Sequence, residues 1–445
     1  MNKLAAFFHN KDVLNRVLFT LAIFFVFRIG SAITVPGVKV NESVWDNRYD
    51  AFSILNMMGG GALQNFSIFA LGVSPYITSQ IIVQLLSMDV LPALTQMTKE
   101  GETGRKKLDV VNRMLAVILA AIQAYGIIVA LQNADGLTLV DSSAWGYVKI
   151  VIFMVAGSMM LNWMGDQITD KGIGNGISMM IFVGIISSLP SQLANAFDTF
   201  LKNNVNTGDP SLILQGAVQI FIYILAFVAI IIFVTFIEKS VRKLPVSHSN
   251  QSQAIEEESM QSSFLPIKVN ASSVMPVIFA SSIMVAPSII ISLFSNGNPP
   301  DWAKKIEEVF NYQALTTMGN VKFPWGTIIY AVLIIMFAYF YSQLEINPER
   351  IAENFQNSGT YITGVKPGTE TQRYISRILY RITFMGSLAL TFIALLPLIL
   401  TLTGAVPQSL ALGGTGLIIV VGVTLEVYNQ INGIMAGNGY VESEL

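Results

Sequence analysis

Ten apolar stretches, each close to the length of a membrane-spanning helix, follow one another along this chain of 445 residues. A helix needs about 20 apolar residues to cross the hydrocarbon core of a bilayer. Only 12% of the residues are charged, whereas soluble domains average about 25%. We therefore predict an all-α integral membrane protein with ten spans, over residues 17–36, 74–91, 114–132, 147–165, 177–197, 213–237, 271–295, 325–344, 383–403 and 409–428.

The predicted loops differ in positive charge between the two sides of the membrane. Loops on one side hold about three times as many Lys and Arg residues as loops on the other, and cytoplasmic loops carry such an excess. This bias predicts a multi-pass protein of the cell membrane with both termini in the cytoplasm.

The residues that catalytic and metal sites require are scarce in the spans. The chain holds no cysteine, and its two histidines, His9 and His248, lie in predicted cytoplasmic segments. No Asp or Glu lies in the middle of a predicted span, where coupled transporters usually place ionisable groups. The acidic residues nearest the spans lie at span ends: Asp89, Asp166, Glu345 and Glu426. We predict no enzyme activity, no bound metal and no cofactor, so the energy for any work comes from a partner.

A glycine-broken apolar segment precedes the second span. It reads FSILNMMGGGALQNFSIFALG over 52–72 and contains Gly59, Gly60 and Gly61. Each glycine costs a helix about 1 kcal/mol relative to alanine. Irregular backbone at membrane depth is tolerated only where protein or a water-filled cavity surrounds it. The segment fits a re-entrant half-helix that caps a cavity on a glycine hinge, or an interfacial helix that serves packing alone.

Arg28 is the charged residue placed well inside a predicted span. Its long side chain can reach the membrane interface or bond backbone carbonyl groups. Alternatively, it holds the first span against the glycine-broken segment. The sequence allows both interpretations.

The stretch GGGALQNFSIFALGVSPYITSQIIVQLL (59–86) resembles the plug and second span of the SecY family of protein-conducting channels. Four further stretches resemble this family in the same order along the chain. They are ITDKGIGNGISMMIFVGI (168–185), PIKVNASSVMPVIFASSI (266–283), INPERIAENFQNSGTYITGVKPGTETQRYISRIL (346–379) and LGGTGLIIVVGV (412–423). The resemblance covers nearly the whole chain.

This resemblance implies a fold of two pseudo-symmetric halves with five spans each. The N-terminal half covers 1–212, with a re-entrant plug half-helix at about 52–72. The C-terminal half covers 213–445, with cytoplasmic loops at about 238–269 and 345–382. Members of the family pass unfolded polypeptides through an hourglass-shaped channel and release apolar segments sideways into lipid. The same function is implied here, in a bacterial plasma membrane.

The family closes its channel with the plug and with a ring of aliphatic side chains. Matched motif by motif, the ring positions here are Ile77, Ile81, Ile181, Ile185, Ile278 and Ile419. Residues four apart lie on one face of a helix, as the two pairs in this set require. Gly59, Gly60 and Gly61 are the implied plug hinge. Without the resemblance, these isoleucines would count as ordinary lipid-facing or core residues.

The family also opens sideways, at a lateral gate between spans 2 and 7. Polar groups at that seam hold it shut and yield to an apolar signal helix. The implied gate residues here are Gln84, Gln123, Ser281 and Ser282. Their alternative role is that of small polar packing residues.

The cytoplasmic loops of the family dock a ribosome or a SecA motor. Basic residues at the matching positions are Arg242, Lys243, Lys366, Arg373 and Arg377. Lys366 stands where an arginine is expected, and this exchange loses bidentate geometry.

The tip of the 238–269 loop departs from the family pattern. Glu256, Glu257 and Glu258 stand where positive charge is expected. Because Lys and Arg dominate contacts with nucleic-acid phosphates, an acidic tip should weaken ribosome binding. This departure leads to the hypothesis of an accessory Sec channel dedicated to a narrow set of exported substrates, beside that of the general channel.

Two hypotheses from other classes remain: a substrate-specific secondary transporter that binds its solute at the broken helix, and a membrane scaffold without conduction. The family implies several partners, namely a SecE-type subunit, in many members a SecG-type subunit, a SecA-type motor or a ribosome, preprotein substrates and membrane lipid.

Overall fold

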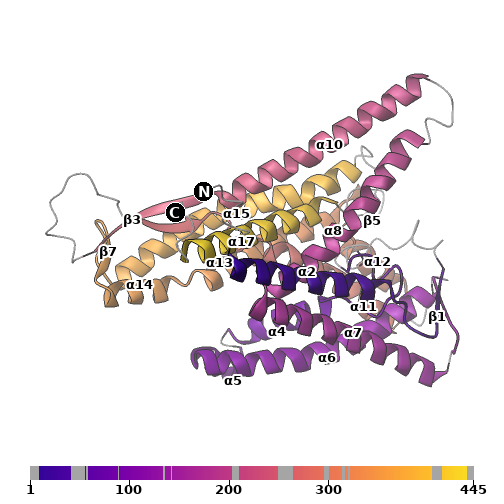
Figure 1. The fold of residues 1–445 in the computed structure, drawn as a ribbon, viewed down its shortest axis with the longest axis horizontal. Helices are drawn as coiled ribbons and strands as arrows, with labels where there is room; N and C mark the ends of the chain where they lie inside the picture. The colour runs from indigo at the N-terminus through magenta and orange to yellow at the C-terminus, as the bar shows by residue number, and fades with distance from the viewer. Residues whose placement is uncertain are drawn as a thin grey trace.

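The computed structural model describes residues 10–41, 56, 59–88, 90–133, 136–141, 143–202, 210–248, 264–294, 300–312, 316–318, 321–402 and 413–437. Each of the ten predicted spans overlaps a helix (Figure 1). These helices are α2 (Lys11–Ala32), α4 (Ser74–Leu86), α6 (Glu102–Asn133), α7 (Ala144–Lys171), α8 (Gly176–Phe197), α10 (Pro210–Lys239), α11 (Met275–Phe294), α13 (Trp325–Glu345), α15 (Thr369–Leu402) and α17 (Gly413–Gly437). The predicted all-α membrane architecture is confirmed.

The helices differ in how far they can reach across a bilayer. Eight are long and apolar enough to cross it, and α11 contributes a shorter apolar stretch, Met275–Ile291. Helix α4 has only 13 residues, which at 1.5 Å per residue is about 20 Å long. The hydrocarbon core is about 30 Å thick, so α4 by itself is too short to cross it; the 59–73 segment precedes it directly.

Side-chain caps fix where several helices begin. Asn10 Oδ1 accepts a hydrogen bond from the backbone N–H of Asp12 at 3.1 Å at the start of α2. Asn175 Oδ1 accepts one from the N–H of Ile177 at 3.1 Å at the start of α8. Caps of this kind contribute about 1 kcal/mol each because they satisfy N–H groups that have no partner within the helix.

The same packing order occurs twice along the chain. Helix α4 contacts α6, α6 contacts α7, and α7 contacts α8. In the second series α11 contacts α13, α13 contacts α15, and α15 contacts α17. The two series meet where α11 contacts α4 and α6, and where α17 contacts α8 and α2. This repetition is what two pseudo-symmetric five-helix halves require.

A three-stranded antiparallel sheet occupies one end of the molecule, where the sequence indicated loops. Strand β3 (Val241–His248) pairs with β4 (Phe264–Lys268) on one edge and with β7 (Thr360–Ile362) on the other. The two largest predicted loops are therefore joined by backbone hydrogen bonds. The short helices α5 (Pro92–Lys99) and α14 (Pro348–Asn357) lie at this same end (Figure 1).

The opposite end carries two short strand pairs and an amphipathic helix. Strand β1 (Val38–Val40) pairs with β2 (Leu137–Leu139), and β5 (Thr316–Met318) pairs with β6 (Val321–Phe323). Helix α12 (Asp301–Phe310) lies beside them (Figure 1). A five-residue π-helical turn, Asp198–Lys202, continues α8 at this end.

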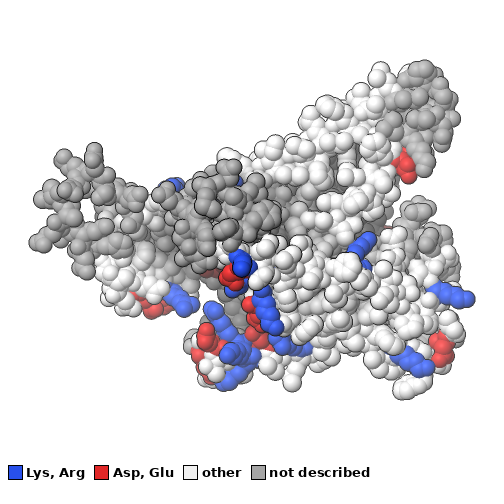
Figure 2. Space-filling model, viewed as in Figure 1, with Lys and Arg blue, Asp and Glu red and all other residues white. Residues whose placement is uncertain are grey.

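On the face shown in Figure 2, charged side chains are sparse in the middle of the molecule. Figure 2 shows Lys, Arg, Asp and Glu gathered over α5 and the start of α6, and again near β1, with a largely uncharged band between them. That band is where exposed Leu, Ile and Phe side chains of α2, α6 and α7 face outward. An apolar belt between two charged ends is the arrangement that a bilayer requires.

Candidate pore, plug and lateral gate

The six isoleucines predicted to form the ring come together in one buried cluster. They lie on four helices, with Ile77 and Ile81 on α4, Ile181 and Ile185 on α8, Ile278 on α11 and Ile419 on α17. Their exposed fractions lie between 1% and 4%. The cluster also holds residues of α2, α7, α10, α13 and α15, so the six isoleucines lie in a core that both helix series share.

The glycine-broken segment forms a chain of tight turns over residues 59–73, not a helix. Positive φ angles explain this difference from the predicted half-helix: Gly60 has φ +66°, Gly61 +84°, Gly72 +57° and Phe66 +43°. Left-handed backbone interrupts a right-handed helix at each such residue. Of residues 52–58, only Asn56 lies within the described part of the chain, and it is helical.

The turn segment (residues 59–73) packs into both main hydrophobic clusters. Ala62, Phe69 and Val73 belong to the cluster that contains the six isoleucines. Leu63 and Phe66 belong to a second cluster with residues of α6 and α7. The segment therefore joins the cluster that holds the six isoleucines to the cluster that holds Leu137 of β2.

Polar contacts fix the turn segment from several sides. Arg28 Nη1 of α2 donates to the Gly60 carbonyl at 3.0 Å, so the side chain both bonds a backbone carbonyl and ties the first span to this segment. The Val35 N–H donates to the Phe66 carbonyl at 3.0 Å. Ser158 Oγ of α7 donates to the Gly72 carbonyl at 3.0 Å. The sequence alone gave no reason to single out Ser158.

Gly60 fits closely against α8. A Cβ atom at this position would lie 2.6 Å from Ser187 Oγ and 3.1 Å from the Gly184 Cα. Gly61 has the same left-handed backbone, yet a Cβ there would meet nothing within 4 Å. The two neighbouring glycines therefore differ. Position 60 requires glycine both for its left-handed backbone and because α8 leaves no room for a Cβ atom, whereas position 61 requires it only for its backbone conformation.

The predicted gate residues behave in three different ways. Gln84 of α4 accepts a hydrogen bond at Oε1 from the hydroxyl of Tyr341 on α13, at 2.6 Å. Ser281 and Ser282 donate at 2.8 and 2.9 Å to the carbonyl of Ile278 in their own helix. Gln123 of α6 is buried, and its Oε1 has no hydrogen-bond partner among the described residues. Sequence analysis missed Tyr341 because its partner is 257 positions away.

Comparison with known proteins identifies the family. The SecY family model matches residues 67–428. This chain belongs to the SecY family. It is 41% identical over 436 residues to protein translocase subunit SecY 1 of Lactobacillus kefiranofaciens subsp. kefiranofaciens, covering 98% of this chain and 97% of the relative. It is 42% identical over 429 residues to protein translocase subunit SecY of Halalkalibacterium halodurans, covering 96% of both chains.

Solved structures of protein-conducting channels share the fold. The structure described as that of a protein conducting channel matches with a TM-score of 0.65 at 18% identity, over 97% of this chain and 95% of that one. Sec61 in the canine ribosome-channel complex matches with a TM-score of 0.62 at 18% identity, with the same coverage. The SecY-family resemblance read from the sequence is confirmed.

Two of the predicted docking residues of this SecY-family chain lie in the sheet. Arg242 and Lys243 belong to β3 and pair with Ile267 and Pro266 of β4. Lys243 Nζ lies 4.3 Å from the centre of the Phe264 ring, a distance suited to a cation–π contact. Both basic residues are exposed.

The other three predicted docking residues lie beyond β7. Lys366 is exposed in the turn between β7 and α15, and its carbonyl accepts a hydrogen bond from Thr371 Oγ1 at 2.9 Å. Arg373 and Arg377 are exposed on α15. The acidic tip, residues 256–258, lies outside the described residues.

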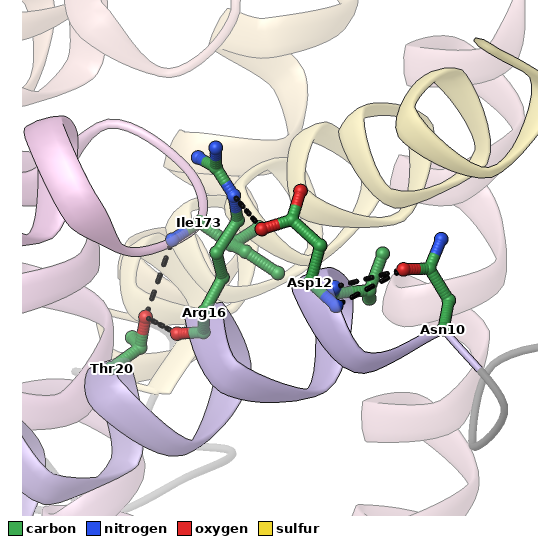
Figure 3. A network of polar contacts seen from close by, with 6 residues as sticks. Asn10, Asp12, Arg16, Thr20 and Ile173 are labelled. Atoms are coloured by element: carbon green, nitrogen blue, oxygen red, sulfur yellow. Dashed lines mark hydrogen bonds and ion pairs between the residues drawn. The ribbon is translucent and has the colours of Figure 1, made fainter. Parts of the chain in front are cut away.

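Thr20, in the middle of α2, bonds to the loop between α7 and α8 (Figure 3). Thr20 Oγ1 donates to the Arg16 carbonyl at 2.9 Å and accepts from the Ile173 N–H at 3.3 Å. The Gly174 N–H in the same loop donates to Gln430 Oε1 of α17. Helices α2 and α17 therefore meet at this short loop.

Proposed function

We propose that this chain forms the central channel of a Sec protein translocase, which passes unfolded polypeptides across the membrane. The burial of Ile77, Ile81, Ile181, Ile185, Ile278 and Ile419 in one cluster, beside the turn segment, is the observation that supports this function most directly. In this proposal the six isoleucines form the pore ring, and residues 59–73 act as the plug.

Aliphatic side chains suit a seal that must open for many different substrates. An apolar constriction holds back ions because water leaves it, and so no charged gate is required. It offers no hydrogen bond or charge to a passing side chain, so it does not retain particular sequences. The turn segment adds a second barrier, with Gly59, Gly60 and Gly61 as its proposed hinge.

The proposed lateral gate lies where α4 meets the second helix series. Gln84, Gln123, Ser281 and Ser282 lie near this seam, and the hydrogen bond from Tyr341 to Gln84 links the two series. Hydrogen bonds between membrane helices average about 0.6 kcal/mol. A bond of this size can yield to the partitioning of an apolar signal segment into lipid.

The proposal includes the partners and placement of the chain. We place it in a bacterial plasma membrane with both termini in the cytoplasm. Its two halves, residues 1–212 and 213–445, are held together by a SecE-type subunit. A SecG-type subunit is a further proposed partner. Arg242, Lys243, Lys366, Arg373 and Arg377 are the proposed contacts for a SecA-type motor or a ribosome. The Sec61 structure named above, which shares this fold, is described as part of a canine ribosome-channel complex.

The experiment that tests the function replaces ring residues in the full chain. Each variant is then reconstituted in vesicles together with its partner subunits. Ile181→Asn together with Ile278→Asn should raise ion leakage, because asparagine keeps water in the constriction. Ile181→Val with Ile278→Val should leave the leak low, since it preserves an apolar lining. Equal leakage of both pairs, or motor-independent uptake of a small solute instead of preprotein transport, would contradict the proposed channel.

A further inference from the structure

The apolar side of helix α12 is only partly covered by the rest of the protein. Ala303 is 1% exposed, and Phe310 packs against the cluster that contains the six isoleucines. Trp302 and Ile306 continue this apolar side of the helix, yet they are 65% and 38% exposed. Val309 lies on the same face one turn further on and is half-buried. Trp302, Ile306 and Val309 therefore form an apolar strip that points away from the bundle.

The other side of α12 carries the charges of the helix. They are Asp301, Lys304, Lys305 and Glu308, and all four are exposed. Successive residues of an α-helix are rotated by about 100°, so Lys304 lies nearly opposite Trp302. A helix with one apolar and one strongly charged face is typical of segments that lie in the plane of a membrane surface.

The junction with α13 fixes the position of α12. Thr327 Oγ1 in the first turn of α13 donates a hydrogen bond to the Tyr312 carbonyl at 2.9 Å. The rings of Tyr312 and Tyr330 stack with their centres 4.6 Å apart. Gly326 allows the backbones to approach, because a Cβ atom there would lie 2.4 Å from the Asn311 carbonyl oxygen. The chain that leaves α12 is therefore held against the first turn of α13.

This first turn of α13 is where a membrane-spanning stretch begins. The part of α13 that is apolar enough to cross a membrane starts at Trp325, which is 40% exposed. Trp145, 67% exposed, lies in the first turn of α7, which follows β2 at the same end of the molecule. Tryptophan is enriched at the headgroup level of a bilayer. The junction with α13 thus places α12 at this level.

The size of the apolar strip favours lipid over a protein partner. The strip consists of three side chains on a helix of ten residues, which is about 15 Å long. A stable protein interface buries about 800 Å² on each partner, far more than three side chains provide. A bilayer sets no such minimum, because it covers whatever apolar surface lies at its depth.

We propose that α12 lies in the boundary between headgroups and acyl chains and anchors the α11–α13 junction there. Trp302, Ile306 and Val309 enter this boundary, and the charged side of the helix faces water. Helices of this kind bury their apolar face about 5–10 Å deep. Because α12 contacts both α11 and α13, the anchor sets the depth of two membrane helices at once. The inference does not depend on the channel function.

The test uses Trp302 as a reporter of depth. In the full chain, the other tryptophans are replaced by phenylalanine; they are Trp45, Trp145, Trp163 and Trp325. The protein is reconstituted in phosphatidylcholine vesicles that carry bromine atoms either near the headgroup end of the acyl chain or near its terminus. Bromines near the headgroup should quench Trp302 fluorescence more strongly than bromines near the chain terminus.

A second reporter on the charged side of the helix is the matched control. In the same background, Trp302→Phe with Lys304→Trp moves the fluorophore by two residues to the opposite side of α12. Acrylamide in the water should quench this reporter more strongly than it quenches Trp302, and both bromine positions should quench it less. Ile306→Asp places a charge within the apolar strip and should reduce the quenching of Trp302 by lipid bromines.

Three results would overturn the anchor. Strong quenching of Trp302 by acrylamide, with none by lipid bromines, would show that the strip faces water. Protection of Trp302 from both quenchers would show that protein covers the strip, either a second copy or another part of the chain. Equal lipid quenching of the two reporters would show that α12 has no fixed orientation at the membrane surface.

Discussion

The hydroxyl of Tyr341 donates a 2.6 Å hydrogen bond to Oε1 of Gln84 and thereby joins α13 to α4. Helix α4 belongs to the first helix series and α13 to the second. The Tyr341 ring also packs edge-on against Phe279 of α11, with ring centres 4.8 Å apart. One residue therefore connects a polar contact between the halves with an aromatic contact inside one of them.

Replacing Tyr341 by phenylalanine removes this hydrogen bond and keeps the ring. The loss of about 0.6 kcal/mol corresponds to roughly a threefold shift toward the open gate. We expect export of a preprotein with a shortened signal core to increase by that factor. Tyr339→Phe is the matched control, since the Tyr339 hydroxyl has no hydrogen bond within the described residues. Equal export by both variants would show that the bond does not hold the gate.

Gly60→Ala should loosen the plug more than Gly61→Ala does. Both substitutions place a side chain on left-handed backbone, which costs about 1 kcal/mol. Only the Cβ at position 60 also meets Ser187 and the backbone of Gly184. We expect higher resting ion conductance in planar bilayers for Gly60→Ala. A conductance that rises equally in both variants would assign the effect to backbone strain alone.

Arg28→Met should weaken the attachment of the turn segment to α2. It removes the 3.0 Å hydrogen bond to the Gly60 carbonyl, and bonds from charged donors contribute about 1.5–3 kcal/mol. Protease or cross-linking probes at Gln64 should then react faster in the resting channel. Arg28→Lys retains a charged donor and should react at an intermediate rate. If Gln64 reacts at the same rate in Arg28→Met as in the parent chain, Arg28 does not help to hold this segment in place.

Ser273→Gly should stabilise the protein. Ser273 has φ +50°, and its carbonyl accepts a hydrogen bond from Asn270 Nδ2, which also donates to Glu238 Oε1 at 2.6 Å. Glycine adopts this backbone without the cost of about 1 kcal/mol that serine bears, so the unfolding temperature should rise by about 1–2 °C.

The neighbouring serine provides the control for that prediction. Ser272 donates to Asn270 Oδ1 at 3.3 Å and has no positive φ, so Ser272→Gly should lower the unfolding temperature. If both glycine variants unfold at lower temperature than the parent chain, strain at Ser273 is not the governing effect. Thermal unfolding in detergent, followed by tryptophan fluorescence, compares the variants.

The helical part of the fold could be predicted because each span carries its own signal. Twenty apolar residues define a membrane helix without reference to any other part of the chain. The sheet could not be predicted in this way. Strand β7 has three residues and pairs with β3 more than a hundred positions earlier, so no local pattern records the pairing. The backbone of the turn segment likewise depends on positive φ angles at Gly60, Gly61, Phe66 and Gly72, which the sequence permits but does not specify.

In the candidate site, too, some features could be predicted from the sequence and others could not. The family resemblance selected six isoleucines that the structure gathers into one cluster, although their identity alone would mark them as ordinary core residues. The hydrogen bonds at the seam were less accessible to sequence reasoning. Gln84 was selected as polar, but its partner, Tyr341, lies in a helix that no spacing rule connects to α4.

The shortness of α4 also bears on which substrates the proposed channel can carry. The cost of placing a charged side chain in a membrane is largest in the full thickness of hydrocarbon, and α4 spans only about 20 Å. In the proposed channel, a passing lysine or glutamate would be away from water over a shorter path than the bilayer itself imposes. One ring of isoleucines could therefore serve substrates of very different charge.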